Sequence, residues 1–301
     1  MAKIPHTDLD VHPLCLGGNV FGWTADRDQS FAVLDAYAAA GGNFIDTADL
    51  YAGGESEKIV GAWMAERGNR DDVVVATKMG MEDGSKNLRA DTIRAQAEAS
   101  LAALGTDRID LYYAHQDDED TPVAETLGGF DALVREGKVR HIAASNFSAE
   151  RLAEAEETSR REGLARYVAL QPHYNLMVRD EFEGAVQDIC LDNDLAVFPY
   201  FALASGFLTG KFRSADADSK RGNRYEDDPI GPAVLEALDE VAGAHGVPPA
   251  AVALAWLAAQ DTVLSPIASA RTTEQLDDLL AFVGLELSGD ELDRLTAASA
   301  R

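Results

Sequence analysis

Eight short hydrophobic runs recur along the 301-residue chain, and segments with helical periodicity separate them. The runs are Leu14–Gly18, Asn43–Ala48, Val73–Lys78, Ile109–His115, His141–Asn146, Val168–Pro172, Ala196–Phe201 and Val263–Ser269. Several are continuously apolar, as expected for strands buried on both faces of a parallel sheet. Eight strands alternating with helices favour a (β/α)8 TIM barrel over an open doubly wound sheet, and α/β barrels of this length often form one unit. We therefore expect a single barrel domain over residues 1–301.

The intervening segments carry signals for helix ends. A stripe that begins at Phe31 predicts a helix with Asp28 as its N-cap, and Ser148 is the expected N-cap of a later helix. Pro122 fits the first position of another helix. Residues 211–231 break the alternation, because they are polar and rich in charges of both signs. A loop of that length inside a domain is often a lid or clamp, so we expect it to clamp a bound cofactor.

The charge and the cysteines limit the possible partners and compartment. Acidic residues outnumber basic ones by 52 to 26, a formal net charge of −26, and such a surface repels nucleic acid and anionic membranes. Cys15 and Cys190 lie in apolar surroundings and predict buried, reduced thiols rather than a disulfide. Residues 1–13 do not resemble a signal peptide, and the longest apolar stretch, Pro248–Ala259, is too short to span a bilayer. We expect a cytoplasmic monomer without nucleic-acid or membrane partners.

Ionisable side chains end several of the predicted strands, where a barrel places its chemistry. Asp46 and Lys78 end neighbouring runs, Tyr51 follows the first of them, and His115 ends the next run along the chain. An unpaired buried ammonium is costly, so a buried Lys78 requires a counter-charge, which Asp46 can supply. We expect no metal. Taken singly, each of these residues has an ordinary structural explanation, but their recurrence at successive strand ends favours a catalytic set.

A tyrosine can act as an acid only with help from its surroundings. Its phenol has a reference pKa of about 10, and a neighbouring lysine ammonium favours the phenolate. We therefore expect Lys78 to bring the pKa of Tyr51 towards the range of a general acid, with Asp46 keeping Lys78 protonated. A neutral His115 can donate a hydrogen bond to a substrate carbonyl. Trp23 fits the rim of a substrate pocket, whereas His141 and His173 are expected to be structural.

Motifs in the same order along nearly the whole chain point to one family. The run Asn43-Phe-Ile-Asp-Thr-Ala-Asp-Leu-Tyr51 is similar to its Asp-Thr-Ala-x-x-Tyr signature. Similar motifs are Ala76-Thr-Lys78, Asp110-Leu-Tyr-Tyr-Ala-His115, Ser145-Asn-Phe147, Leu170-Gln-Pro-His-Tyr-Asn175, Phe198–Lys211 and Ile267–Leu276. The chain thus resembles the aldo-keto reductases. The resemblance implies NADPH-dependent reduction of an aldehyde or ketone, with Tyr51 as the proton donor.

The resemblance also implies where NADPH binds, without a Rossmann domain; indeed, no Gly-x-Gly-x-x-Gly follows an early strand. Ser145, Asn146 and Gln171 would hold the nicotinamide carboxamide, and Tyr200 would stack on the ring. The other implied cofactor contacts are Gly18, Asn19, Asp46, Phe201, Leu203, Ser205, Lys211, Arg221, Ser269, Arg271, Gln275 and Asp278. The cations Lys211, Arg213, Lys220, Arg221 and Arg224 fall within 14 positions, and in so acidic a chain local cations can hold an anionic cofactor. Of these, Arg213, Lys220 and Arg224 are expected to be solvated loop residues. The substrate pocket would include Trp23, Tyr51 and His115.

Two departures and two alternatives remain. Leu279 stands where the family often has Asn, which puts one adenine contact in doubt, and Phe201-Ala202 replaces a common Ser-Pro pair. The main alternative is an NADPH-binding redox sensor with little turnover, because potassium-channel β subunits resemble this family. That alternative is weaker here because His115 stands where those subunits have Asn. A barrel lyase or isomerase without nicotinamide is also compatible with the fold.

Overall fold

The computed structural model describes all residues except 83–84, 212–224 and 226. Within them, one eight-stranded parallel sheet has the order β11-β10-β9-β8-β5-β4-β3-β12. Neighbouring strands of this sheet are consecutive along the chain, except that β12 lies next to β3. The strands are β3 (Cys15–Gly17), β4 (Phe44–Asp46), β5 (Val74–Met79), β8 (Ile109–Ala114), β9 (Val139–Ser145), β10 (Tyr167–Gln171), β11 (Ala196–Val197) and β12 (Ile267–Ala268). Each lies within or overlaps an expected run, so all eight expected strands are confirmed.

Hydrogen bonds between the last two strand segments close the sheet. Val197 N donates to Thr262 O at 3.0 Å, Leu264 N donates to Val197 O at 3.0 Å, and Ile267 N donates to Pro199 O at 2.9 Å. β12 also pairs with β3 in parallel register. These bonds join β11 to the segment that leads into β12 and so confirm the expected (β/α)8 barrel.

Side chains alternate between two buried layers, as the two-residue period of a strand requires. On β5, Val74 and Ala76 belong to the barrel interior, whereas Val75 and Met79 pack in the layer under the helices. The side chain of Lys78 therefore points into the barrel, and that of Thr77 points towards the helices. The same alternation turns Asp46, His115, Ser145, Gln171, Tyr200 and Ser269 towards the interior at the carboxyl ends of their strands.

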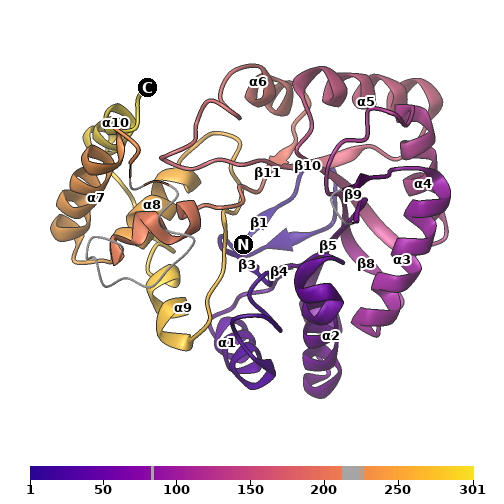
Figure 1. The fold of residues 1–301 in the computed structure, drawn as a ribbon, viewed down its shortest axis with the longest axis horizontal. Coiled ribbons are helices and arrows are strands. Elements are labelled where there is room, and N and C mark those ends of the chain that lie inside the picture. The colour runs from indigo at the N-terminus through magenta and orange to yellow at the C-terminus, as the bar shows by residue number, and fades with distance from the viewer. Residues whose placement is uncertain (83–84, 212–224, 226) are drawn as a thin grey trace.

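Helices surround this sheet (Figure 1). They are α1 (Arg27–Ala39), α2 (Glu55–Arg67), α3 (Ala90–Leu104), α4 (Val123–Arg135), α5 (Ala149–Glu162), α6 (Ala185–Asp192), α7 (Gly231–His245), α8 (Pro249–Ala258), α9 (Thr273–Leu280) and α10 (Gly289–Ala298). The prediction that Asp28 caps α1 is wrong: Asp26 is the N-cap and forms a capping box with Gln29. Pro122 is itself an N-cap rather than the first helical residue, and Ser148 caps α5 as expected.

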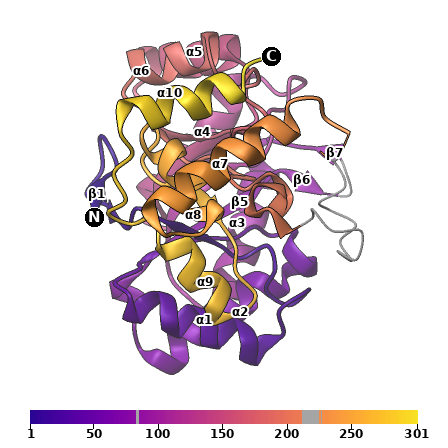
Figure 2. The same cartoon turned by 90° about the vertical axis from the view of Figure 1, so that its left-hand side faces the viewer.

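The last third of the chain adds helices on one side of the barrel, where α7, α8 and α10 lie together (Figure 2). Among the described residues, no single helix has the length and apolar character needed to cross a membrane. α7 and α8 pass that test only as a pair, and they meet at a bend of 97°. α8 is buried over most of its length, as a core helix would be.

An N-terminal hairpin, which the sequence did not predict, covers the amino-terminal end of the barrel. Its strands are β1 (Ala2–Lys3) and β2 (Asp10–Val11), and it lies across the middle of the barrel in Figure 1. Ile4, Leu9 and Val11 are buried and join the interior cluster below Phe44 and the other inward side chains. The hairpin therefore fills one end of the barrel with apolar side chains.

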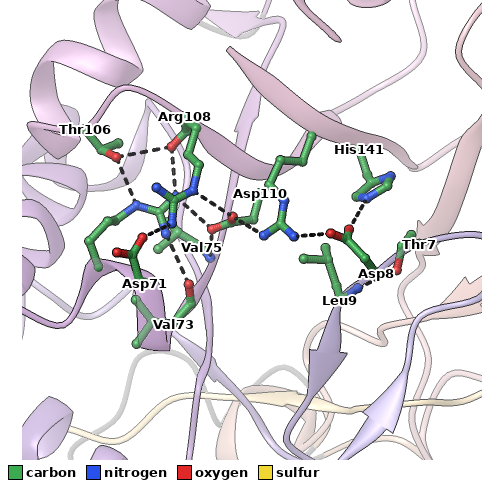
Figure 3. A network of polar contacts seen from close by, with 12 residues as sticks. Thr7, Asp8, Leu9, Asp71, Val73, Val75, Thr106, Arg108, Asp110 and His141 are labelled. Atoms are coloured by element: carbon green, nitrogen blue, oxygen red, sulfur yellow. Dashed lines mark hydrogen bonds and ion pairs between the residues drawn. The ribbon is translucent and has the colours of Figure 1, made fainter. Parts of the chain in front are cut away.

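A polar network links this hairpin to the barrel strands, and Figure 3 shows Asp110 at its centre. Asp110 is fully buried, and its carboxylate binds Arg70 at 2.8 Å and Arg140 at 2.9 Å. Arg140 also reaches Asp8 of the hairpin at 2.8 Å, and His141 contacts the other Asp8 oxygen at 3.1 Å. Arg108 lies 3.7 Å from the same carboxylate, which thus pairs with three guanidinium groups, one of which anchors the hairpin.

Replacement of Asp110 by Ala should destabilise the protein, because it leaves three partly buried guanidinium groups without their central carboxylate. We expect a loss of about 3 kcal/mol in the free energy of unfolding, measured by urea titration. The matched control is Asp71→Ala, which removes a carboxylate that pairs with Arg108 at 2.6 Å but has a side chain 90% exposed. That control should change stability by less than about 1 kcal/mol. Equal losses in both variants would contradict the central role of Asp110.

Candidate active site

The carboxyl-terminal end of the barrel brings together Asp46, Lys78 and Tyr51, as expected. Lys78 Nζ donates to Asp46 Oδ2 at 2.6 Å, to the Thr47 carbonyl at 2.8 Å and to the Tyr51 hydroxyl at 3.3 Å. Lys78 is fully buried, so its three acceptors account for all three protons of the ammonium. The three side chains therefore form one connected chain from carboxylate to phenol.

Electrostatics keep Lys78 charged. Burial lowers the pKa of Lys78, but the attraction of Asp46 and Tyr51 outweighs it, so the net pKa lies above the ordinary value. The second oxygen of Asp46 accepts a hydrogen bond from Gln171 Nε2 at 2.9 Å, which fixes the direction of the carboxylate. A buried ion pair with its remaining atoms satisfied is the arrangement that a low-dielectric interior tolerates.

The pKa of Tyr51 departs from expectation. Desolvation raises it above the ordinary value, and the charge of Lys78, together with its hydrogen bond, opposes that rise. Lys78 thus offsets the effect of burial in this structure and does not bring the pKa below that of a free tyrosine. The expectation counted the ammonium but omitted the burial of the phenol, which a sequence does not show.

His115 faces Tyr51 across the barrel mouth. Their rings are 6.2 Å apart at 82°, an edge-to-face arrangement. Burial, and then the charge of Lys78, lowers the pKa of His115 to about 3. Its Nδ1 is buried and makes no hydrogen bond to any residue that the structure describes. His115 is therefore a neutral imidazole, as expected, in a position suited to a hydrogen bond with a ligand.

The residues proposed for the nicotinamide form a second connected group. Ser145 Oγ donates to the Gln171 carbonyl at 2.8 Å, and Asn146 Nδ2 donates to Ser145 Oγ and to the His115 carbonyl, each at 3.0 Å. Tyr200 OH donates to Asn146 Oδ1 at 2.8 Å. Asn146 has a left-handed backbone, with φ of 58°, a conformation that asparagine adopts more readily than most residues.

His173 also belongs to this region, although it was expected to be a structural histidine. Its ring stacks on Tyr200 with 5.3 Å between centroids and 14° between planes, and it meets the edge of Phe201 at 5.6 Å. Its Nδ1 lies 3.2 Å from Glu181. The signal that could have revealed it is parity, because His173 lies two residues after the inward-facing Gln171. His141, in contrast, binds Asp8 in the network at the other end of the barrel, as a structural residue would.

A third group lies where β12 meets β3. Ser269 Oγ donates to Asn19 Oδ1 at 2.6 Å, and Gly18 N donates to the Asp46 carbonyl at 2.7 Å. A Cβ added to Gly17 would lie 2.5 Å from Ser269 Oγ, so the backbone there can approach its neighbours only as glycine. The structure thus connects Gly18 and Asn19 with Asp46 and Ser269, four of the expected cofactor contacts.

Cationic side chains follow at the outer edge of this group. Desolvation and the nearby charge of Arg271 lower the pKa of Lys211, so the two cations lie close enough to repel each other. Arg271 N donates to Gln275 Oε1 at 3.0 Å, just before α9. Arg221 lies outside the described residues, as do Arg213, Lys220 and Arg224. Two cations held near each other in so acidic a protein favour an anionic ligand.

The loop after β11 has an unusual backbone. Phe201, Ala204 and Ser205 all have left-handed φ, of 52°, 48° and 56°. Leu203, between them, is partly buried against the core. Such a concentration of strain in one loop at the barrel mouth is typical of a binding segment.

The remaining expected contacts lie further out. Asp278 is exposed on α9. Leu279, which stands where the family often has Asn, is buried in the core and faces away from solvent. Trp23 is 55% exposed, beyond β3 at the same end of the barrel as Tyr51. The structure therefore leaves Trp23 at a rim position and removes Leu279 from the site.

A sequence profile of the Aldo/keto reductase family matches residues 13–300, nearly the whole chain. The chain belongs to the aldo/keto reductase family. It is 37% identical to norsolorinic acid reductase stcV of Emericella nidulans, over 96% of this chain and 78% of that protein. It is 34% identical to the uncharacterized oxidoreductase YrpG of Bacillus subtilis, over 96% and 92%, and 30% identical to aryl-alcohol dehydrogenase GME11368 of Pestalotiopsis microspora, over 97% and 79%. The barrel is thus that of an oxidoreductase of this family.

The low pKa of His115 can be tested directly. Since its pKa is about 3, its ring should stay neutral between about pH 5 and 8, the range in which an unperturbed histidine titrates. Histidine ring NMR signals would be followed against pH, with the His115 signal assigned by its absence in His115→Asn. Titration of that signal with a midpoint near the ordinary histidine value would contradict the neutral form. The signals of the other histidines serve as internal controls.

Proposed function

We propose that this aldo/keto reductase reduces an aldehyde or ketone with NADPH and that Tyr51 donates the proton. The observation that carries the proposal is the hydrogen-bonded chain from Asp46 through Lys78 to Tyr51, with neutral His115 opposite it. A phenol, an ammonium and a neutral imidazole at one barrel mouth suit an oxygen that must receive a proton as it gains negative charge. The names of relatives, which include reductases and an aryl-alcohol dehydrogenase, support a carbonyl or alcohol substrate.

In the proposed reaction NADPH supplies a hydride to the carbonyl carbon. The protein's own groups act on the carbonyl oxygen. His115 donates a hydrogen bond that polarises it, and Tyr51 OH transfers its proton to it. Lys78 stabilises the phenolate that remains, and Asp46 holds the ammonium in place. Because Lys78 is buried, its attraction for the phenolate is stronger than it would be in water.

The residues present fit NADPH. Amide and hydroxyl groups of Ser145, Asn146 and Gln171 provide donors and acceptors for a carboxamide, and Tyr200 provides an aromatic ring next to them. Lys211 and Arg271 provide positive charge for phosphate, which would relieve their mutual repulsion. We propose these six as cofactor residues, with Arg271 bound to the 2′-phosphate.

Replacement of Tyr51 by Phe should abolish most of the activity, because Tyr51 is the phenol that hydrogen-bonds Lys78 among the described residues. We expect kcat to fall at least about 100-fold, while the Kd for NADPH changes by less than about twofold. Activity would be followed optically as NADPH oxidation with a panel of aldehydes and ketones, and NADPH binding by fluorescence. Lys78→Met should be similarly severe.

The matched control is Tyr112→Phe, which makes the same chemical change on β8 but in the layer under the helices. It should keep the wild-type kcat. Normal turnover in Tyr51→Phe would show that the proton comes from another group. Tight NADPH binding without turnover of any carbonyl by the wild type would favour a redox sensor, and the absence of NADPH binding would exclude both functions.

Replacement of Arg271 by Ala tests the choice of cofactor. Loss of a charge-assisted contact to the 2′-phosphate should raise the Kd for NADPH about 10- to 100-fold and leave the Kd for NADH nearly unchanged. Fluorescence titration with each cofactor measures both constants. If both affinities weaken equally, Arg271 does not contact the 2′-phosphate.

A further inference from the structure

Two threonines are sequence neighbours of the proposed catalytic residues and point to the opposite face of the sheet. Thr47 follows Asp46 on β4, and Thr77 precedes Lys78 on β5. Because neighbouring residues of a strand point to opposite faces, these hydroxyl groups turn away from the barrel interior and towards the helix layer. Both threonines are fully buried. Any element that binds them is therefore fixed relative to the strands that carry Asp46 and Lys78.

The first turn of α2 binds both threonines. Ser56 Oγ and Thr47 Oγ1 are 2.7 Å apart, and Ser56 Oγ also donates to the Gly18 carbonyl at 2.8 Å. Thr77 Oγ1 donates to Glu57 Oε1 at 2.6 Å. Ser56 is fully buried, and Glu57 is 2% exposed. Two consecutive side chains thus attach the start of the helix to the backs of β4 and β5.

Burial makes Glu57 an expensive residue at this position. Desolvation raises the pKa of Glu57, and hydrogen bonds with Thr77 and Ser100 and the charge of Lys78 only partly oppose that effect. A carboxyl group in this layer loses its water and keeps few partners in return. Apolar side chains fill most of the same layer, so the carboxyl group is better explained by a specific contact than by packing.

The turn between β4 and α2 shows what that contact controls. Tyr51 opens a short 3₁₀ turn that ends at Gly54, directly before α2. Ala52, Gly53 and Gly54 all have left-handed φ, and Ala52 is a residue that adopts this conformation at a cost. At the start of the turn, Tyr51 N donates a hydrogen bond to the Ala48 carbonyl at 3.1 Å. At its end the Glu55 N–H donates to the Tyr51 and Ala52 carbonyls, and no side chain caps α2. Ser56 and Glu57 then attach the start of the helix to the strands.

We propose that Ser56 and Glu57 are positioning residues for Tyr51. Their hydrogen bonds to Thr47 and Thr77 fix α2 against β4 and β5 and so hold the Tyr51 hydroxyl within reach of Lys78. The inference rests on the proposed role of Tyr51 as proton donor. It adds that the distance between the Tyr51 hydroxyl and Lys78 Nζ depends on contacts between the strands and the helix layer, outside the barrel mouth.

The test uses Glu57→Ala, Glu57→Gln and Thr77→Val in the full chain with NADPH. We expect Glu57→Ala and Thr77→Val to lower kcat about tenfold, because a small displacement of a reacting group costs rate, while the Kd for NADPH changes by less than about twofold. Glu57→Gln should recover most of kcat, because its amide oxygen still accepts the hydrogen bond from Thr77. If Glu57→Ala does not fold, the other two variants carry the comparison.

Ser159→Ala is the matched control. Ser159 also carries a buried hydroxyl, which donates to the Ala165 carbonyl at 3.0 Å. It lies near the end of α5, between β9 and β10 in the chain, and these strands are not neighbours of β4 in the sheet. It should lower the thermal midpoint and leave kcat unchanged. A lowered thermal midpoint with wild-type kcat in Glu57→Ala and Thr77→Val would reduce Glu57 to a stability role and overturn the proposal. A kcat as low in Glu57→Gln as in Glu57→Ala would also overturn it, since charge and not position would then matter.

A second readout needs no turnover. NMR of ¹³C-labelled tyrosine rings reports the surroundings of the Tyr51 phenol, with its signal assigned by comparison with Tyr51→Phe. The signal should shift in Glu57→Ala and Thr77→Val and stay in place in Ser159→Ala. An unchanged signal would overturn the positioning role even if the wild type reduces carbonyls. If the wild type reduces none, the proposed function fails, while the shift still decides whether Glu57 positions Tyr51.

Discussion

The ion pair between Lys78 and Asp46 is the constraint on which the rest of the site depends. A fully buried ammonium is tolerated only if each of its protons finds an acceptor, and here the acceptors are a carboxylate, a backbone carbonyl and the Tyr51 phenol. The same requirement orders the surroundings. Gln171 binds the far side of Asp46, and the charge of Lys78 contributes to the neutral state of His115. One buried cation therefore determines the partner of the phenol and adds to the effect of burial, which is the larger cause of the low pKa of His115.

The two ends of the barrel differ in how their charged and polar side chains are paired. At the amino end, Asp110 pairs with three guanidinium groups and the hairpin closes the interior. At the carboxyl end, polar side chains from most of the strands turn inward, and strained residues such as Ala204 and Ser205 lie near them. The amino end uses its charges to hold segments together. The carboxyl end keeps polar atoms such as His115 Nδ1 without a partner among the described residues.

Much of this arrangement could be predicted from the sequence. Strand identity and inward parity follow from short apolar runs, so all eight strands and the meeting of Asp46, Lys78, Tyr51 and His115 were accessible. What could not be predicted depends on three-dimensional burial or on contacts between distant segments. The pKa of Tyr51 rises because of desolvation, the ring of His173 stacks on a residue of the next strand, and the hairpin has too few residues to show a period. The cap of α1 was misplaced because Asp26 and Asp28 both suit that role, and only the backbone distinguishes them.

The hairpin has a practical consequence for protein engineering. Ile4, Leu9 and Val11 are buried at the amino-terminal end of the barrel, opposite the end that carries Tyr51 and Lys78, and their burial stabilises the fold. Libraries that seek greater thermal tolerance can therefore be directed to the hairpin and its neighbours. Libraries that seek a new substrate belong on the loops around Trp23 and Phe201. The molecule offers two separate regions for selection, and gains made in the first can compensate for losses caused by changes in the second.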